Sequence, residues 1–158
     1  MKSLITNENG QSIVEAAVSM GLLLCMVIGV MEGGWLLYAY HYTAYTAREG
    51  ARWATVRGSA CANTTVATAM PCPVLASDVQ TYVVGMSSAA LIKLQPSDVS
   101  VSWQIAPNGT APCSPSTQCN NPGDQVVVKV SYNFLLSVPL IPIPSVKVHS
   151  TSQMIMSQ

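Results

Sequence analysis

The chain has 158 residues, of which 49% are hydrophobic and only 9% are charged, and its formal net charge is zero. A soluble domain carries about 25% charged residues, so this composition leaves too few charges for an ordinary soluble surface. Nucleic-acid binding requires clustered basic residues, and the local group of Arg48, Arg52 and Arg57 has Glu49 interleaved. The composition therefore excludes a nucleic-acid partner, and the length allows one domain plus a membrane segment.

Residues 1–10 form a polar segment ahead of the first apolar run. Lys2 and Glu8 cancel in charge, and the Asn-Glu-Asn-Gly ending is typical of an exposed, protease-accessible segment. An ordinary secretory leader places its apolar region before the cleavage site, whereas here the apolar region comes afterwards. Two interpretations remain open: a leader peptide that is removed, and the disordered tail of an uncleaved anchor.

A single long helix is predicted for residues 11–57, because no proline or strong turn signal occurs before Gly58. No charged residue lies between Glu15 and Glu32, and Leu, Val, Ile and Met dominate that run, so the first half of the helix is predicted to span a membrane. The run is short for a bilayer. Either the bilayer thins or residues 35–38 also enter, which leaves Glu32 within or near the apolar slab, where an acid requires a partner.

Small and aromatic residues are distributed along this helix in distinct groups. A row of small residues at intervals of four lies in the span: Ala17, Gly21, Cys25, Gly29 and Gly33. In lipid such a row permits close approach of another helix, although chance composition explains it equally well. Alanines at spacings of three and four predict a packing face beyond the span: Ala44, Ala47, Ala51 and Ala54. Aromatic residues mark the exit from the membrane: Trp35, Tyr38, Tyr40, Tyr42 and Tyr45.

The remainder of the chain predicts a small mixed domain. A second helix is expected from Ser77 to Leu94, since Ser77 and Gln80 have the capping-box spacing and Pro96 ends the pattern. Three strands are expected at residues 98–105, 125–134 and 146–156, the first alternating apolar residues with serines. The predicted fold class is α+β: a long N-terminal transmembrane helix, a second helix and a small antiparallel sheet of about three strands in the head.

Residues 135–144 connect the last two strands and are apolar but interrupted by prolines. Their leucines and isoleucines either fold back onto the sheet or form an exposed surface that contacts a partner. We favour the contact surface.

Four cysteines lie beyond the long helix, whereas Cys25 lies within its apolar run. Cys61, Cys72, Cys113 and Cys119 in a small head suggest two disulfides and an oxidising compartment, and hence an extracytoplasmic head. Three pairings are possible. We favour Cys61 with Cys72 and Cys113 with Cys119, because each pair brackets a loop rich in Asn, Thr, Pro and Ser. A zinc site is the alternative, but neither pair has the two-residue separation of a zinc knuckle, so we predict no metal.

Catalytic motifs are not evident in this sequence. His41 lies among tyrosines on the helix and His149 lies on the final strand. A Gly-rich phosphate loop, a paired-acid site and a Ser/His/Asp arrangement are all lacking. We therefore predict a protein that is not an enzyme, with no catalytic residues and no cofactor.

Two blocks of sequence carry a resemblance to a known family. Gly10 precedes Gln11, Glu15 lies four residues further on, and the block Ala47-Arg48-Glu49-Gly50-Ala51-Arg52 closes the apolar helix. The second block, residues 122–132, reads Pro-Gly-Asp-Gln-Val-Val-Val-Lys-Val-Ser-Tyr and precedes a Pro-rich apolar segment and a Ser/Thr-rich final strand. This arrangement resembles the TadE-like family of minor pilins, or pseudopilins, of the tight-adherence, type IV-like pilus system.

The resemblance implies a structural role in a pilus. A prepilin peptidase would cut between Gly10 and Gln11, and Glu15 would pair with the new terminal amine of its own or a neighbouring subunit. Glu32, Gly29 and Gly33 are further candidates for a role in assembly. The implied partners are other pilin or pseudopilin subunits through the N-terminal helix, the inner-membrane pilus assembly platform, the prepilin peptidase and membrane lipid.

The resemblance also implies a domain order and a location. Residues 1–10 would be the leader, residues 11–57 the long helix, and residues 58–158 an extracytoplasmic, disulfide-braced head. The protein would lie in the bacterial inner membrane and reach the pilus or cell surface after assembly. The alternative is a single-span, membrane-anchored extracytoplasmic binding protein that does not polymerise.

Overall fold

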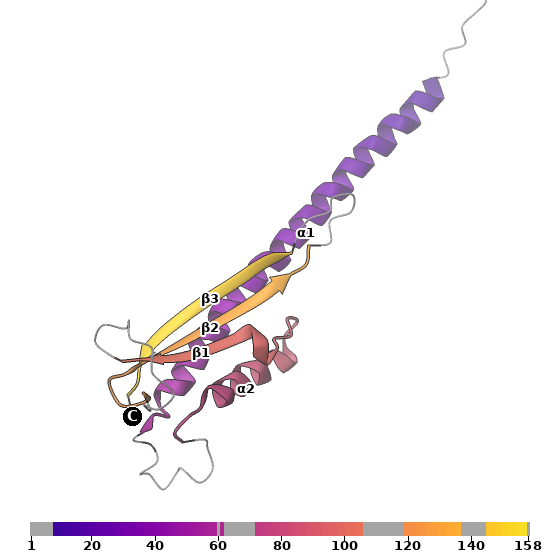
Figure 1. The fold of residues 1–158 in the computed structure, drawn as a ribbon. Helices are drawn as coiled ribbons and strands as arrows, with labels where there is room; N and C mark the ends of the chain where they lie inside the picture. The colour runs from indigo at the N-terminus through magenta and orange to yellow at the C-terminus, as the bar shows by residue number, and fades with distance from the viewer. Residues whose placement is uncertain (1–7, 60, 62–71, 106–118, 137–144, 158) are drawn as a thin grey trace, which may run out of the picture.

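The computed structural model describes residues 8–59, 61, 72–105, 119–136 and 145–157 (Figure 1). Its regular elements are two α-helices, two short 3-10 turns and three strands, in the order α1 (Glu8–Thr55), α2 (Ala76–Met86), η3 (Ser87–Ala89), η4 (Pro96–Asp98), β1 (Val99–Gln104), β2 (Gln125–Phe134) and β3 (Val146–Ile155). The predicted α+β class is confirmed: a long N-terminal apolar helix, a second helix and a three-stranded antiparallel sheet are all present.

The sheet has the strand order β1-β2-β3, and both neighbouring pairs are antiparallel. Val128 in the central strand lies opposite Val101 on one side and Ser152 on the other. Ser100 and Ser102 are exposed while Val99 is buried, as the alternation in the sequence predicts. One face of the sheet is therefore wet and the other faces the helices.

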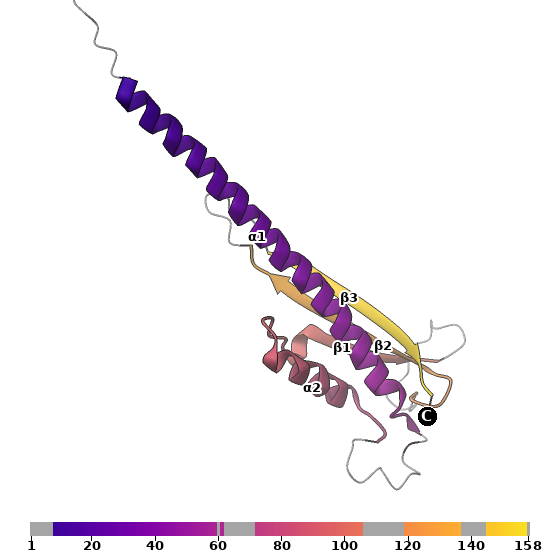
Figure 2. The same cartoon turned by 180° about the vertical axis from the view of Figure 1, so that it is seen from behind.

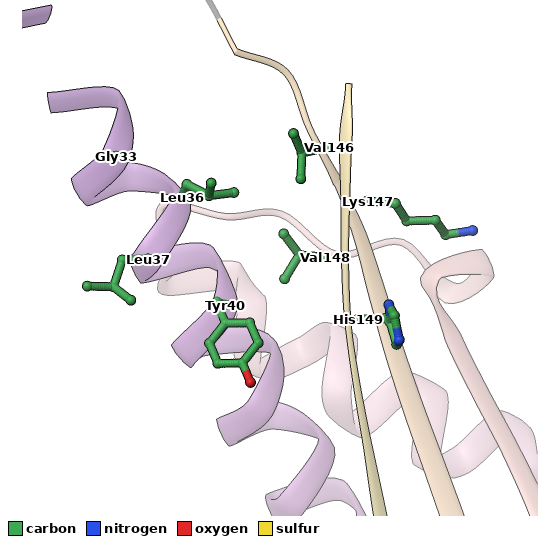
Figure 3. Close-up of a pocket in the computed structure, with 8 residues that line it drawn as sticks. All are labelled: Gly33, Leu36, Leu37, Tyr40, Val146, Lys147, Val148 and His149. Carbon is green, nitrogen blue, oxygen red and sulfur yellow. The ribbon is translucent and has the colours of Figure 1, made fainter. Parts of the chain in front are cut away.

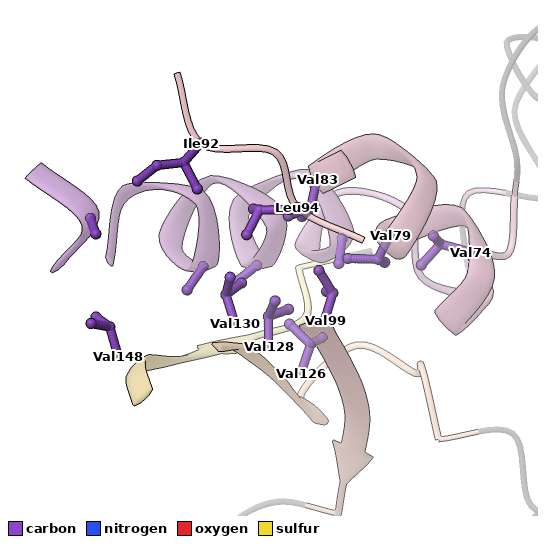
Figure 4. Packing of buried hydrophobic residues seen from close by; sticks show 14 of the residues in the cluster. Val74, Val79, Val83, Ile92, Leu94, Val99, Val126, Val128, Val130 and Val148 are labelled. Atoms are coloured by element: carbon purple, nitrogen blue, oxygen red, sulfur yellow. The ribbon is translucent and has the colours of Figure 1, made fainter. Parts of the chain in front are cut away.

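Both helices pack on the same face of the sheet. In Figure 1 the strands lie in front of α1, in Figure 2, seen from behind, α1 lies in front of the strands, and Figure 4 shows α1 and α2 on one side of the sheet. α1 packs along β2 and β3, whereas α2 packs beside α1 and against β1. The result is a two-layer head from which the N-terminal half of α1 projects as a single helix (Figures 1 and 2).

The core lies between the sheet and the two helices. Val126, Val128 and Val130 point from β2 towards the helices, and Val79 and Val83 of α2 meet them from the opposite layer (Figure 4). All five are fully buried. Burying a valine side chain contributes about 1.5 kcal/mol or more relative to leaving it exposed, so this cluster is a main source of the head's stability.

The core face of α1 is made almost entirely of small side chains. The buried residues of this face recur at helical spacing: Ala39, Thr43, Thr46, Ala47, Gly50, Ala51 and Ala54. The two threonines can be buried because Thr43 Oγ1 donates to the Tyr40 carbonyl at 2.9 Å and Thr46 Oγ1 to the Tyr42 carbonyl at 3.0 Å. Small residues let the helix axis lie close to the sheet, which explains how β-branched valines of β2 fill the interface.

The second helix differs from its prediction at its C-terminal end. The prediction that it runs to Leu94 is wrong, because α-helical geometry ends at Met86 and a 3-10 turn follows. The buried Ser87 hydroxyl donates to the Val84 carbonyl at 2.7 Å and accepts from the Leu94 N–H at 3.2 Å. This serine folds the chain back and so brings Leu94 into the core from a non-helical segment.

The predicted capping box of the second helix is also wrong. Leu75, not Ser77, precedes the first turn, and its backbone N–H donates to Asp78 Oδ2 at 2.9 Å. Tyr82 of α2 is half-buried against the core, and its ring stacks on Trp53 at a centroid distance of 4.8 Å. This stack ties α2 to the C-terminal end of α1.

The end of the head farthest from the projecting helix is held by backbone hydrogen bonds between segments distant in sequence. The Val74 N–H donates to the Arg57 carbonyl at 3.0 Å, and the Ser59 N–H donates to the Asn120 carbonyl at 2.7 Å. The Ser157 N–H donates to the carbonyl of Thr55, the last residue of α1, at 3.0 Å. The C-terminus is thus anchored to the end of the long helix.

Candidate assembly helix

The N-terminal half of α1 is apolar and stands clear of the head. Residues 11–27 are all exposed, and Ile13 and Met26 have 70% and 71% of their surface accessible. Among the described residues, α1 is the one helix long and apolar enough to cross a membrane. Because apolar surface of this extent is unfavourable in water, a bilayer or neighbouring helices must cover it. The composition and position of this half suggest a membrane anchor.

The residues predicted for processing lie in the first turns of α1. Gly10 and Gln11 are exposed and helical, because α1 begins at Glu8, three residues before the predicted start of the helix at Gln11. Helix ends fray, and glycine is a poor helix former, so this turn is the weakest part of α1. Glu15 is exposed one turn further on, four residues from Gln11 and on the same face.

The row of small residues in the span forms an open surface. A Cβ atom added at Gly21, Gly29 or Gly33 would meet no other heavy atom within 4 Å. Gly33 lines a hollow between α1 and β3, whereas at Gly21 and Gly29 a second helix could approach the backbone. Glu32, beside Gly33, is partly buried, unlike the exposed Glu15.

Aromatic side chains line α1 where it enters the head. The Trp35 and Tyr38 rings meet edge to face at 6.2 Å between centroids, and Tyr38 stacks on Tyr42 at 5.9 Å. Tyr38, Tyr40 and Trp35 are exposed, while Tyr42 is half-buried against the core. The aromatic series predicted from the sequence thus continues from the exposed helix into the domain.

The Ala-Arg-Glu-Gly-Ala-Arg block lies at the centre of the contact between α1 and the head. Ala47, Gly50 and Ala51 are buried, whereas Arg48 and Arg52 are exposed. The predicted alanine face is present, except that Ala44 is only partly buried. Sequence reasoning missed Ala39, Thr43, Thr46 and Gly50, although small residues at spacings of three and four were the signal that could have found them.

The described cysteines of the head, Cys61, Cys72 and Cys119, are all disulfide-bonded. Cys61 and Cys72 form a disulfide with their Cα atoms 6.0 Å apart, the pairing that the sequence favoured. Cys119 is also disulfide-bonded and buried, while its predicted partner, Cys113, lies outside the described residues. Cys25 is free and exposed on the projecting part of α1.

The described residues hold no group of three or more His, Cys, Asp or Glu side chains that could bind a metal ion. His41 is exposed on α1 beside Tyr40, with 5.9 Å between ring centroids, and His149 is exposed on β3.

The comparison with known protein families gives a match that lies within α1. The model of the TadE-like protein family matches residues 10–52. No match was found among curated proteins or among solved structures. The matched segment covers the exposed apolar half of α1 and its small-residue contact with the head. The resemblance to the TadE-like family is confirmed for residues 10–52, which carry the first of the two blocks, and this part of the chain is a TadE-like segment.

Proposed function

We propose that this protein is a minor pilin or pseudopilin that enters, or primes the assembly of, a tight-adherence pilus. The match over residues 10–52 associates the chain with that pilus system, and the family is structural rather than enzymatic. The observation that carries the proposal is the division of α1 into two halves. One half is apolar and is exposed throughout residues 11–27, and the other is fixed in the head by buried small residues.

This division suits a subunit that moves from a membrane into a filament. The bare half can exchange lipid for neighbouring helices, because both surroundings cover apolar surface. The buried half keeps the head in one orientation relative to that helix. A protein that only anchors a binding domain needs the span, but it does not need 46 continuous helical residues from Gly10 to Thr55.

Processing before assembly is part of the proposal. A prepilin peptidase would cut between Gly10 and Gln11 and create a terminal amine on Gln11. Glu15 lies four residues away on the same helical face. A carboxylate in an apolar slab requires a countercharge, and the new amine of this subunit or of its neighbour would supply it.

Partners and location follow from the same proposal. The projecting helix would contact other pilin subunits and the inner-membrane assembly platform, and the disulfide-bonded head would lie on the extracytoplasmic side. The Cys61–Cys72 disulfide supports an oxidising compartment. The protein would reside in the inner membrane before assembly and in the pilus, or at the cell surface, afterwards.

Terminal mass spectrometry of envelope-extracted protein tests the processing step. The mature chain should begin at Gln11 in cells with an active prepilin peptidase, and at Met1 in matched cells without it. A chain that still begins at Met1 in both strains would remove the main support for the pilin assignment.

Recovery of the polypeptide in sheared surface filaments tests incorporation. We expect it in that fraction together with other pilus subunits. Recovery only in washed membranes would favour the anchored binding protein instead.

A further inference from the structure

Exposed apolar side chains of the head gather where α1 leaves it. Leu91, in the connection between α2 and β1, is 72% exposed, and Leu135, directly after β2, is 77% exposed. Phe134 pairs with Val146 at the same end of the sheet. These apolar residues come from three separate segments of the chain, so their convergence arises from the fold and not from one local sequence.

Two apolar hollows place Leu91 and Val146 beside one short stretch of α1. The first has a volume of about 610 Å³ and is lined by Gly33, Leu36, Leu37, Tyr40, Val146, Lys147, Val148 and His149 (Figure 3). The second has a volume of about 350 Å³ and is lined by Met31, Gly34, Trp35, Tyr38 and Leu91. At about 100° per residue the two groups of helix residues lie on opposite sides of α1, so the head flanks the helix on both.

This stretch of α1 is also where a bilayer surface would lie. The uncharged run from Ala16 to Met31 rises only about 24 Å, against a hydrocarbon thickness of about 30 Å. The next two turns of α1 must therefore lie near the boundary between acyl chains and headgroups. Those turns carry Trp35 and Tyr38, whose amphipathic rings favour that boundary.

Basic side chains accompany the apolar ones. Lys93 follows Leu91 by two residues, Lys147 directly follows Val146, and both lysines are exposed. Figure 3 shows Val146 pointing towards α1 and Lys147 pointing away from it. The Lys93 ammonium donates to the backbone carbonyls of Ser87 and Ser88, which are neutral acceptors and leave its positive charge at this end of the head. Lysine stems can cover apolar surface, and the positive charge of both lysines complements an anionic lipid surface.

We propose that this end of the head is a second membrane-contacting surface, which rests on the outer leaflet of the bilayer that α1 spans. We call it the collar and define it by Leu91, Lys93, Leu135, Val146 and Lys147. Its apolar side chains would enter the acyl boundary, and its lysines would contact the phosphates of anionic phospholipids. The collar would set the depth of the short span and hold the head upright before assembly. The proposal rests on the membrane span assumed in the proposed function and not on filament formation.

Depth-dependent fluorescence quenching tests the collar in the full-length protein. The protein is reconstituted in vesicles of phosphatidylethanolamine and phosphatidylglycerol that contain lipids with a nitroxide high on the acyl chain. An environment-sensitive fluorophore is attached to Leu91→Cys or Leu135→Cys in a Cys25→Ala background with the head disulfides oxidised. Matched controls are Leu75→Cys and Ile155→Cys, which are 62% and 66% exposed but lie at the opposite end of the head.

Several-fold stronger quenching is expected at the two collar positions than at the two control positions. Quenching at the collar should weaken when phosphatidylcholine replaces phosphatidylglycerol. Collar labels quenched no more than the controls would overturn the proposal. The proposal would also be overturned if the collar labels were shielded from water, as reported by the environment-sensitive fluorophore, only at a high protein-to-lipid ratio. A second copy of the chain, and not lipid, would then cover the collar.

The native Cys25 separates failure of the collar from failure of the proposed function. A label on Cys25 in the otherwise unchanged protein should be quenched strongly, because Cys25 lies within the span. Quenching at Cys25 without quenching at Leu91→Cys and Leu135→Cys would sink the collar alone. Absence of quenching at Cys25 would show that α1 does not span the membrane, and it would contradict both the proposed function and the collar.

Discussion

Gly50 lies where α1 meets both α2 and β2. A Cβ atom at this position would lie 2.7 Å from Cγ2 of Val83 and 3.4 Å from Cγ1 of Val128. Both valines are fully buried, and a β-branched side chain has little rotamer freedom to move aside. The close approach of the two layers therefore depends on the absence of a side chain at this residue.

Gly50→Ala should lower the thermal unfolding temperature of the head. Overpacking costs about 1 to 3 kcal/mol, which exceeds the gain of up to about 1 kcal/mol from alanine's higher helix propensity. Near-UV circular dichroism of detergent-solubilised protein measures the change. Gly29→Ala is the matched control, because its Cβ would meet no atom within 4 Å, and its head should unfold at the wild-type temperature. Equal unfolding temperatures for the two variants would contradict this account.

The Cys61–Cys72 disulfide closes a loop with a sequence separation of 11 residues. Replacing both cysteines by serine should lower the free energy of unfolding by about 2 to 4 kcal/mol, mainly because the unfolded chain gains freedom. Denaturant unfolding measures the effect. Cys25→Ser should leave the stability of the head unchanged, since Cys25 is exposed outside it. A double variant as stable as wild type would show that the bridge is not a stabilising element.

At the scale of the element, α1 uses small residues for two different contacts. Those in its C-terminal half are buried against the sheet and α2, whereas Gly21, Gly29 and Gly33 are exposed. The residues of the first set already contact the head. Of the second set, Gly21 and Gly29 could receive another helix, and close backbone approach is a main source of helix association in lipid.

Gly29→Leu should therefore reduce co-assembly while leaving membrane insertion and head folding intact. The added side chain would keep a neighbouring backbone at a distance without touching the head. Recovery in sheared filaments and crosslinking from Cys25 report co-assembly. Gly85→Leu is the control, since Gly85 is an equally open glycine on α2, outside the span. If Gly29→Leu were recovered in filaments at the wild-type level and Cys25 gave no crosslink, chance composition would explain the row of small residues in the span.

At the scale of the whole molecule, two acidic residues of the projecting helix lie at the two ends of a long uncharged run. Glu15 lies near its start and Glu32 near its end, where the head begins to cover the helix. An ionised acid near a helix N-terminus is stabilised by the helix dipole, by about 0.3 to 1 kcal/mol. That gain is small, so an effect of Glu15 on assembly would have to come from pairing with another charge.

Glu15→Ala should leave insertion and cleavage largely intact and reduce incorporation into filaments. The expected loss follows from removing the countercharge of the new terminal amine in an apolar surrounding. Quantifying the subunit in sheared filaments and in membranes separates incorporation from insertion, and terminal mass spectrometry checks cleavage. Unchanged incorporation would exclude this role for Glu15.

Much of the fold was predictable because its signals are local. β2 has the predicted bounds, since an apolar run follows the turn at Gly123, whose φ of 97° favours glycine. α1 was predictable to within two or three residues at each end, since it contains no proline and the first turn signal comes at Gly58. The apolar character of its first half also came directly from composition.

The end of α2 was not predictable in this way. The apolar spacing continues to Leu94, but the helix stops where the Ser87 hydroxyl bonds the Val84 carbonyl and the Leu94 N–H. Serine competes for backbone hydrogen bonds in many positions, and only the burial of this one made that competition decisive.

The sequence by itself determined that the chain has a long apolar helix followed by a small α+β head, and it predicted disulfides in that head. Hydrophobic period, composition and cysteine position are properties of neighbouring residues, and they need no knowledge of distant contacts. Only the tertiary structure decided which small residues of α1 face the sheet and that Leu91 and Val146 lie on opposite sides of α1 where it leaves the head. Those positions depend on the packing of segments far apart in the chain, and helical or strand periodicity carries no information about that packing.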